Sequence, residues 1–207
     1  MASLPMLAGL PSPLRQWLLP TKGLAVFYGC PQMGRLSHYF LPRLLIQGKR
    51  VLYLDGANRF SPLLLARLAR ERGRDSAEFN RNMRIARAFT CFQLTELLAR
   101  APRLLRSFPA DFVLLTGLPE LYFDEDAGES DAFASFRQAL RGLQGLARLL
   151  PVAVFSDASS FLTPRRRLFR QLTARADYVS KFDAKEDRTL TVTAEKAPVP
   201  AMLPARR

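Results

Sequence analysis

The sequence has few of the residues that build metal centres, disulfide frameworks and histidine-based catalytic sites. Its 207 residues include two cysteines, Cys30 and Cys91, one histidine, His38, and one tryptophan. These residues provide neither a metal-ligand spacing nor a disulfide pattern. No Ser-His-Asp, Cys-His or paired-carboxylate arrangement can be assembled, because the acidic residues from Asp124 to Asp131 share one loop. We therefore expect no metal site and no catalytic residue.

Long apolar runs are absent too, so no segment is expected to cross a bilayer. The first ten residues lack a basic stretch and contain Pro5, and Pro11 follows, which is a poor pattern for a signal peptide. Together with the low cysteine content, these features predict a cytoplasmic protein in a reducing environment, without a membrane partner.

Acidic residues are scarce relative to basic ones, and their distribution is uneven. The chain has 31 Lys and Arg against 18 Asp and Glu, which gives a formal net charge of +13. Residues 111–131 hold seven acidic side chains and no basic one, whereas residues 1–110 hold 17 basic and five acidic ones. Such a positive excess favours an acidic partner, most often nucleic acid. The alternative is an arginine-rich surface in contact with solvent alone.

Apolar runs that alternate with helical patterns define the fold class. Residues 50–55, 111–116 and 151–157 are continuous apolar runs, which are typical of buried parallel strands. We expect a three-layer α/β domain with a mostly parallel central sheet and a C-terminal antiparallel hairpin formed by residues 178–179 and 188–193. Helices are predicted over residues 35–47, 63–72, 91–100, 132–149 and 164–175, with Pro42 kinking the first and residues 102–108 adding a turn to the third. The core spans residues 23–197, between an N-terminal arm (residues 1–22) and a C-terminal tail (residues 198–207).

A loop between the first strand and the first helix has the spacing of a phosphate-binding loop. Gly29 and Gly34 stand five apart, as in G-x-x-x-x-G-K-S/T, but Arg35 replaces the lysine and Leu36 the hydroxyl. Ser37, one place further, either reaches a metal in a shifted register or bonds to the helix backbone. The candidate nucleotide-binding residues of this degenerate loop are Gly29, Cys30, Pro31, Gln32, Met33, Gly34, Arg35, Leu36 and Ser37.

Two further segments resemble RecA/RadA-type strand-exchange recombinases. Residues 54–62, read L-D-G-A-N-R-F-S-P, are similar to the end of that family's second strand, roughly I-D-T-E-G-x-F-x-P. Residues 85–98, which contain A-R-A-F and then Gln93 and Leu97-Leu98, resemble the A-R-A-F…Q…L-L segment of its archaeal and eukaryotic branch. The resemblance covers residues 23–195 and implies a RecA-like P-loop NTPase fold.

The same resemblance implies that the ATPase chemistry has been lost. The phosphate-loop lysine and threonine correspond to Arg35 and Leu36, the catalytic glutamate to Ala57, and the Walker B aspartate to Thr116. Phosphoryl transfer depends on positioning and electrostatic stabilisation by such residues. We therefore expect no cofactor, or ATP bound without hydrolysis.

In the recombinases two loops contact DNA, and the resemblance places both in this chain. The first corresponds to residues 118–131, whose carboxylates repel phosphate; it either docks on a basic surface of a partner subunit or of a neighbouring copy, or is solvated. The second corresponds to residues 156–168 and precedes a basic helix start. Its predicted DNA-binding residues are Arg165, Arg166, Arg167, Arg170 and Phe161. The alternative is an exposed helix start with the neighbouring phenylalanines in the core.

From the sequence we therefore expect a recombinase-like pseudo-ATPase that assists DNA repair or recombination. It would bind single- or double-stranded DNA, or a recombinase or repair protein. Two alternatives remain: a nucleotide-binding RecA-like ATPase with an unusual loop, and a structural subunit of a protein complex.

Overall fold

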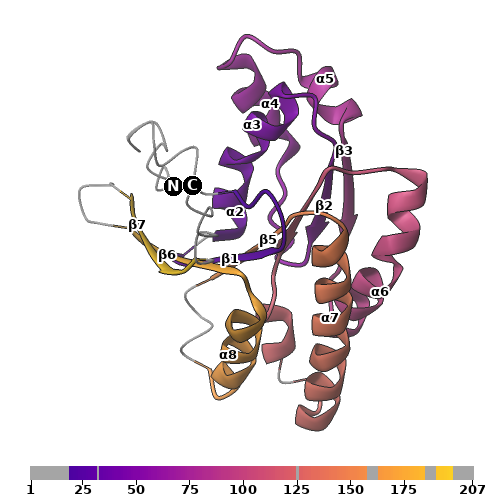
Figure 1. The fold of residues 1–207 in the computed structure, drawn as a ribbon, viewed down its shortest axis with the longest axis vertical. Helices are drawn as coiled ribbons and strands as arrows, with labels where there is room; N and C mark the ends of the chain where they lie inside the picture. The colour runs from indigo at the N-terminus through magenta and orange to yellow at the C-terminus, as the bar shows by residue number, and fades with distance from the viewer. Residues whose placement is uncertain (1–18, 32, 125, 158–162, 185–189, 198–207) are drawn as a thin grey trace, which may run out of the picture.

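The computed structural model describes residues 19–197, apart from residues 32, 125, 158–162 and 185–189 (Figure 1). Most of the predicted N-terminal arm (residues 1–18) and the predicted tail (residues 198–207) therefore lie outside the described residues. So do Gln32 and Phe161. Within the described part, no helix is long and apolar enough to cross a bilayer.

A sheet of seven strands in the order β3-β2-β4-β5-β1-β6-β7 forms the middle layer. All neighbouring strands run parallel except the last pair, β6 and β7, which are antiparallel. This confirms the predicted mostly parallel sheet with a C-terminal antiparallel pair. The strands are β1 (Leu24–Gly29), β2 (Val51–Asp55), β3 (Met83–Arg87), β4 (Phe112–Thr116), β5 (Val152–Ser156), β6 (Tyr178–Ala184) and β7 (Leu190–Lys196).

Helices cover both faces of the sheet, which gives the predicted three layers (Figure 1). Val26 and Leu54 point to one face and Phe27 and Tyr53 to the other, because side chains alternate along a strand. The face of Phe27 is covered by α2 (Met33–Leu36), the 3-10 helix η2 (Ser37–Tyr39), α3 (Leu41–Ile46), α4 (Pro62–Arg70) and α5 (Ser76–Arg81). The face of Val26 is covered by α6 (Cys91–Ser107), the 3-10 helix η3 (Glu120–Phe123), α7 (Glu129–Leu149) and α8 (Arg166–Arg175).

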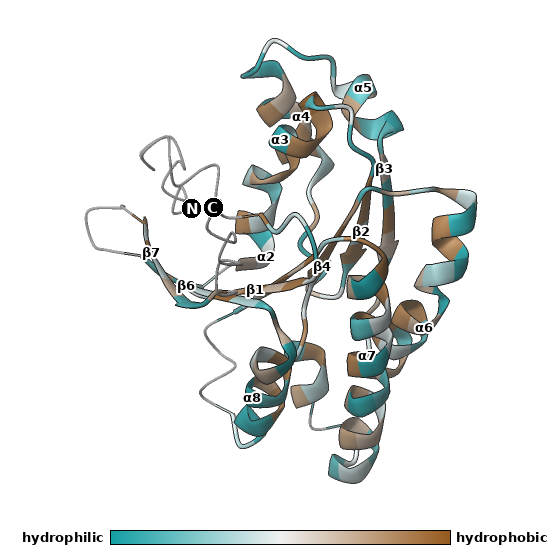
Figure 2. Ribbon diagram, in the orientation of Figure 1, coloured by the Kyte–Doolittle hydropathy of each residue, from teal (hydrophilic) through white to brown (hydrophobic). Residues whose placement is uncertain are grey.

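The strands that carry the core are apolar along their whole length, whereas the long helices are apolar on one side only (Figure 2). Every residue of β2, β4 and β5 is buried. This is why these strands were recognisable as continuous apolar runs. The helix N-termini also follow their sequence signals: Ser61 accepts a hydrogen bond from the Leu64 amide, and Thr90 accepts one from the Gln93 amide.

The structure corrects one predicted helix, confirms the extension of another and adds a short one. The helix predicted over residues 35–47 is divided into α2, η2 and α3, because Pro42 lacks an amide hydrogen and lies in the first turn of a new helix. The predicted third helix continues as α6 through Pro102 to Ser107, which confirms the turn expected over residues 102–108. The short helix α5, whose N-cap is Asp75, was not predicted, because six residues carry too little periodicity to recognise.

Candidate functional site at the carboxyl edge of the sheet

The carboxyl ends of four parallel strands meet at one edge of the sheet and surround a pocket of about 250 Å³. The connection after β1 crosses one face of the sheet and the connection after its neighbour β5 crosses the other, so a crevice opens between them. Residues that follow β1, β2 and β4 and residues at the end of β5 line this pocket, whereas residues 89–90, after β3, do not. The lining residues are Gly34, Gly56, Ala57, Arg59, Gly117, Glu120, Leu121, Phe155 and Asp157.

Two glycines allow the loops around this pocket to lie against one another. Gly117 has a φ of 80°, and a Cβ on it would lie 2.3 Å from the carbonyl carbon of Gly56. Gly29 has a φ of 124°, and a Cβ there would lie 2.4 Å from the carbonyl oxygen of Phe182. Larger residues would push these backbones apart. The glycine that opens the predicted phosphate loop thus serves close packing against β6.

The amides at the start of α2, which a phosphate loop would direct toward its ligand, point to a carboxylate of the chain itself. The Met33 amide donates to Asp157 Oδ1 at 2.7 Å, and the Gly34 amide also bonds to this carboxylate. Burial raises the pKa of Asp157, and these two amides and the Arg59 guanidinium act in the opposite direction. Asp157 therefore occupies the position where the loop would hold an anion.

The other loop side chains are either packed in the protein or turned to solvent. Leu36 is fully buried in the core, and Arg35 is exposed. Ser37 Oγ donates to the Gly34 carbonyl at 2.7 Å and lies 2.7 Å from the Tyr53 hydroxyl, so its bonds are to the protein. Cys30 is buried, and burial raises the pKa of its thiol to about 11. Pro31 is exposed.

Asp55 at the end of β2 is fully buried and both of its carboxylate oxygens are engaged. Oδ1 accepts from the Arg59 amide at 3.0 Å and from Thr116 Oγ1 at 3.1 Å. Oδ2 accepts from the Phe60 amide at 2.9 Å and pairs with Arg87 Nε at 3.4 Å. This carboxylate fixes the loop after β2 to β4 and β3.

Thr116, which the resemblance places at the Walker B aspartate, belongs to the same network. Its hydroxyl donates to Asp55 and receives the Ala57 amide at 3.3 Å. Ala57 is the residue placed at the catalytic glutamate. The two positions are therefore adjacent in space, and a backbone-to-hydroxyl bond joins them. Across the described residues, no group of three or more His, Cys, Asp or Glu side chains is arranged to hold a metal ion.

The only histidine of the chain is a structural residue between the loop and α4. His38 is fully buried and its ring stacks on Phe60. Its Nε2 accepts from the Ser61 amide at 2.8 Å, so its Nδ1 carries the hydrogen that is donated to the Arg35 carbonyl at 3.0 Å. Burial lowers the pKa of this imidazole, which keeps it neutral.

Three polar residues of the pocket were not singled out from the sequence. Glu120 Oε1 accepts from Ser156 Oγ and, at 2.9 Å, from the Asp157 amide, which joins the ends of β4 and β5. Asp157 and Arg59 complete the set. The available signal was their position directly after buried strands, where parallel strand ends meet. Two carboxylates and one guanidinium give this pocket an acidic character.

The predicted DNA-binding arginines at the start of α8 divide into two groups. The Arg165 guanidinium donates to the carbonyls of Tyr122, Asp124 and Ala127, at 2.6, 3.0 and 3.0 Å. Arg165 therefore holds the acidic loop against α8.

Arg167 also contacts the neighbouring segment of the chain. Its guanidinium pairs with Glu129 and lies 3.5 Å from the centre of the Phe133 ring. Arg166 and Arg170 are exposed. Phe169 is buried and packs edge-on against Tyr28, whereas Phe161 lies outside the described residues. The acidic loop thus docks on a basic surface of its own chain.

A comparison with models of protein families finds no match for this chain, and neither does a comparison with curated proteins. The function is therefore inferred from the residues and their geometry.

Proposed function

We propose that this chain is a RecA-like core that has lost ATP hydrolysis and acts in DNA repair or recombination by binding. Its ligands would be DNA and a recombinase-type or other repair protein. The proposal rests on the hydrogen bonds at the carboxyl edge of the sheet. The positions that the resemblance assigns to phosphate and metal binding are bonded there to groups of the protein itself.

A nucleotide with Mg²⁺ does not fit these residues. Asp157 lies on the loop amides, Leu36 offers no hydroxyl, and Glu120 and Asp157 would face phosphate oxygens of the same charge. Phosphoryl transfer needs an oriented nucleophile and neutralised phosphate oxygens, and the edge supplies neither. We therefore propose no reaction at this pocket.

Exposed arginines support the DNA-binding part of the proposal. Arg166 and Arg170 lie four residues apart on α8 and face solvent. Neither forms an ion pair with a described residue, in contrast to Arg167. Lysines and arginines that neutralise phosphates release counterions, so such a surface binds nucleic acid in a salt-dependent manner. The net charge of +13 favours encounter with DNA in any orientation.

The exposed edge of the sheet supports the protein-partner part. Strand β3 has a neighbour on one side only among the described strands, and Ile85 and Phe89 are 43% and 60% exposed at this edge. An edge strand with apolar side chains is suited to pairing with a strand of another protein. A recombinase-type partner would bind here without using the pocket.

DNA binding is tested by titrating labelled single- and double-stranded oligonucleotides with the protein between 50 and 200 mM salt, concentrations at which phosphate contacts dominate. We expect binding that weakens with salt. The double substitution Arg166→Ala/Arg170→Ala should reduce the log–log slope by roughly 1.4 to 1.8, since each lost contact contributes about 0.7 to 0.9. The control is Arg103→Ala/Arg106→Ala, which removes the same charge from exposed positions on α6.

Nucleotide binding and partner binding need separate measurements. ATP with Mg²⁺ should leave the thermal unfolding midpoint unchanged, whereas a ligand present at 100 times its Kd would stabilise by about 2.7 kcal/mol. Absence of salt-dependent DNA binding, combined with failure to retain a recombination or repair protein from a lysate, would reject the proposed function.

A further inference from the structure

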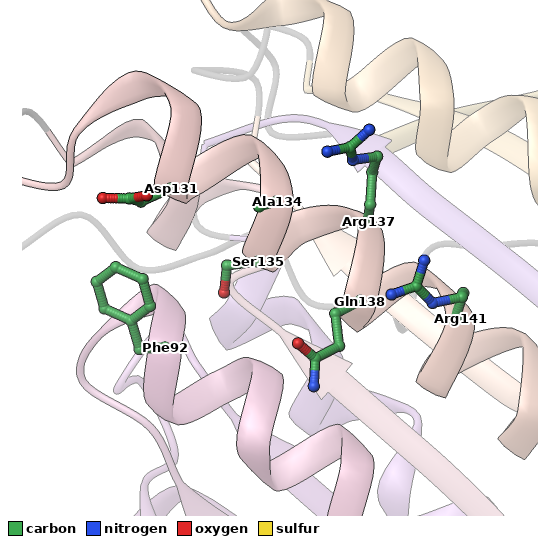
Figure 3. Close-up of a pocket in the computed structure, with 7 residues that line it drawn as sticks. All are labelled: Phe92, Asp131, Ala134, Ser135, Arg137, Gln138 and Arg141. Atoms are coloured by element: carbon green, nitrogen blue, oxygen red, sulfur yellow. The ribbon is translucent and has the colours of Figure 1, made fainter.

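A groove separate from the carboxyl-edge pocket lies between α6 and α7 (Figure 3). The two helices approach closely where a Cβ on Gly142 would lie 3.3 Å from the Leu98 backbone. Nearer their N-terminal ends they leave a groove of about 510 Å³. It is lined by Phe92, Asp131, Ala134, Ser135, Arg137, Gln138 and Arg141.

The floor of the groove is closed by hydrogen bonds within the protein. Thr95 Oγ1 donates to the Cys91 carbonyl at 2.9 Å and lies 2.6 Å from the Tyr122 hydroxyl and 2.7 Å from Ser135 Oγ. These buried hydroxyls bond to one another and to the backbone. A ligand would therefore contact the side chains of the rim rather than the floor.

The rim combines an exposed aromatic ring with two arginines that have no ion-pair partner among the described residues. Phe92 is 51% exposed and stacks on none of the described rings. Arg137 and Arg141 are both exposed and lie one turn apart on α7, where like charges repel. No ion pair or ring contact among the described residues explains this arrangement, so a binding role accounts for it better than a structural one.

We propose that this groove binds single-stranded nucleic acid, with a base stacked on Phe92 and backbone phosphates on Arg137 and Arg141. Aromatic rings beside a basic surface are the combination by which proteins hold unpaired strands. The proposal rests on the DNA-binding part of the proposed function and specifies its surface and the form of the nucleic acid.

The polarity of the groove orients the strand. Figure 3 shows Phe92 and Asp131 at one end and Arg137 and Arg141 toward the other. The Asp131 carboxylate repels phosphate but accepts hydrogen bonds from base amino groups. The Gln138 amide adds a donor and an acceptor between the two ends. Bases therefore belong at the Phe92 end and phosphates at the arginine end.

The side of α7 that carries the two arginines begins next to the start of α8. Phe133, Arg137 and Arg141 follow one another at four-residue intervals, so they form one stripe along α7. Arg167 of α8 lies over Phe133 at the beginning of this stripe. A strand bound by Arg137 and Arg141 would therefore pass close to the start of α8. Duplex DNA offers no unstacked base to Phe92, so the groove selects single strands.

The test uses fluorescence anisotropy with a labelled oligo(dT) and a duplex of equal length, applied to the full chain. Phe92→Ala should weaken oligo(dT) binding at least about fivefold, since stacking on one aromatic is worth roughly 1–3 kcal/mol per base. Duplex binding should change less than twofold. The control is Leu149→Ala, which removes an exposed apolar side chain at the C-terminal end of α7, outside the groove.

The arginines are tested by the salt dependence of the same binding. Arg137→Ala/Arg141→Ala should lower the log–log slope for oligo(dT) by roughly 1.4, because a single strand contributes about 0.7 per phosphate contact. Arg103→Ala/Arg106→Ala serves again as the charge-matched control and should lower it by much less. Phe92→Ala should leave the slope unchanged. Thermal unfolding midpoints confirm that each variant is folded.

Several outcomes would contradict nucleic-acid binding in this groove and leave the proposed function unaffected. One is normal oligo(dT) binding in all groove variants while Arg166→Ala/Arg170→Ala weakens it. Others are equal losses in Phe92→Ala and Leu149→Ala, or binding of a polyglutamate peptide that depends on Arg137 and Arg141 but not on Phe92. If the unmodified protein binds neither oligonucleotide, the groove proposal and the DNA-binding part of the proposed function fail together.

Discussion

The carboxyl edge of the sheet and the outer surface of α7 and α8 use their charges in opposite ways. At the edge, the charge of Asp55 is buried and bonded on both oxygens, and Asp157 is held by backbone amides. On the outer surface, Arg137, Arg141 and Arg166 have no ion-pair partner among the described residues. The first region uses its charges to join loops within the protein, whereas these three arginines of the second have no such role among the described residues.

This contrast follows from how buried and exposed charges are accommodated in a protein. A buried carboxylate is tolerated when several donors surround it, and such a network fixes the loops it joins. The exposed arginines Arg137, Arg141 and Arg166 form no ion pair with a described residue, so the fold depends on them less. Removing edge residues should therefore cost stability, whereas removing surface residues should cost binding alone.

The largest effect is expected at Asp55. Asp55→Ala would leave two amides, the Thr116 hydroxyl and the Arg87 guanidinium without their acceptor. We expect the free energy of unfolding to fall by about 3–5 kcal/mol, as when a buried charged network loses one member. Urea unfolding measures this change. The exposed Asp126→Ala should change stability by less than about 0.5 kcal/mol; equal effects of the two substitutions would contradict the structural role of Asp55.

The next effect separates two neighbours in the basic cluster. Arg165→Ala should lower the free energy of unfolding by about 1.5–3 kcal/mol, because its guanidinium bonds three backbone carbonyls of the acidic loop. Arg166→Ala should stay within about 0.5 kcal/mol of the unmodified protein. Both are measured by chemical denaturation at the same salt concentration. If Arg166→Ala lowered the free energy of unfolding and Arg165→Ala did not, the structural role assigned to Arg165 would be wrong.

These two arginines also mark the limit of what the sequence can predict. The strands were predictable because continuous apolar runs such as residues 112–116 need only local information. The run from Arg165 to Arg167 reads as one basic cluster, since nothing local distinguishes its members. Arg165 finds its partners 38 to 43 positions away, and the Met33 amide finds Asp157 at a separation of 124. Partners so distant along the chain are set by the topology alone.

A third effect depends on pH and tests whether the His38 imidazole is buried and neutral in the folded protein. Its pKa is lowered in the folded protein from an ordinary value of 6.5, so below that pH the unfolded chain binds a proton that the folded protein does not. The contribution of His38 to the free energy of unfolding should therefore be fully present above about pH 6.5. It should decrease as the pH drops, by up to about 1.4 kcal/mol per pH unit. His38→Asn should flatten this dependence between pH 6.5 and 5, and no other histidine can contribute.

Unfolding curves of the two proteins, recorded every half unit of pH, provide the measurement for His38. The carboxylates titrate alike in both proteins, so the difference between the two profiles isolates the imidazole. Parallel profiles would mean that His38 is protonated as readily in the folded protein as in the unfolded chain.

A smaller effect is expected at Asp157. Asp157→Ala would leave the Met33 and Gly34 amides without their carboxylate and should lower stability by about 1 kcal/mol, as does the loss of a helix cap. Asp157→Asn, which retains an acceptor oxygen, should cost less. Neither variant should gain a thermal shift with ATP and Mg²⁺, because Leu36 and Thr116 still offer no metal site. A clear shift in Asp157→Ala would show that this carboxylate alone prevents nucleotide binding.

The smallest change in stability is expected at Arg137, and its sign is opposite to those above. Arg137→Glu replaces a repulsive pair with a Glu–Arg pair in the preferred order along α7, so stability should rise by a few tenths of a kcal/mol. The same substitution should weaken oligo(dT) binding, because it places a carboxylate beside the phosphates. Arg137→Gln should lie between the two proteins in both measurements. If the replacement of Arg137 stabilises the fold and weakens binding, the residue serves the ligand rather than the fold. A gain in stability without a loss in binding would show that Arg137 is not part of the nucleic-acid-binding groove.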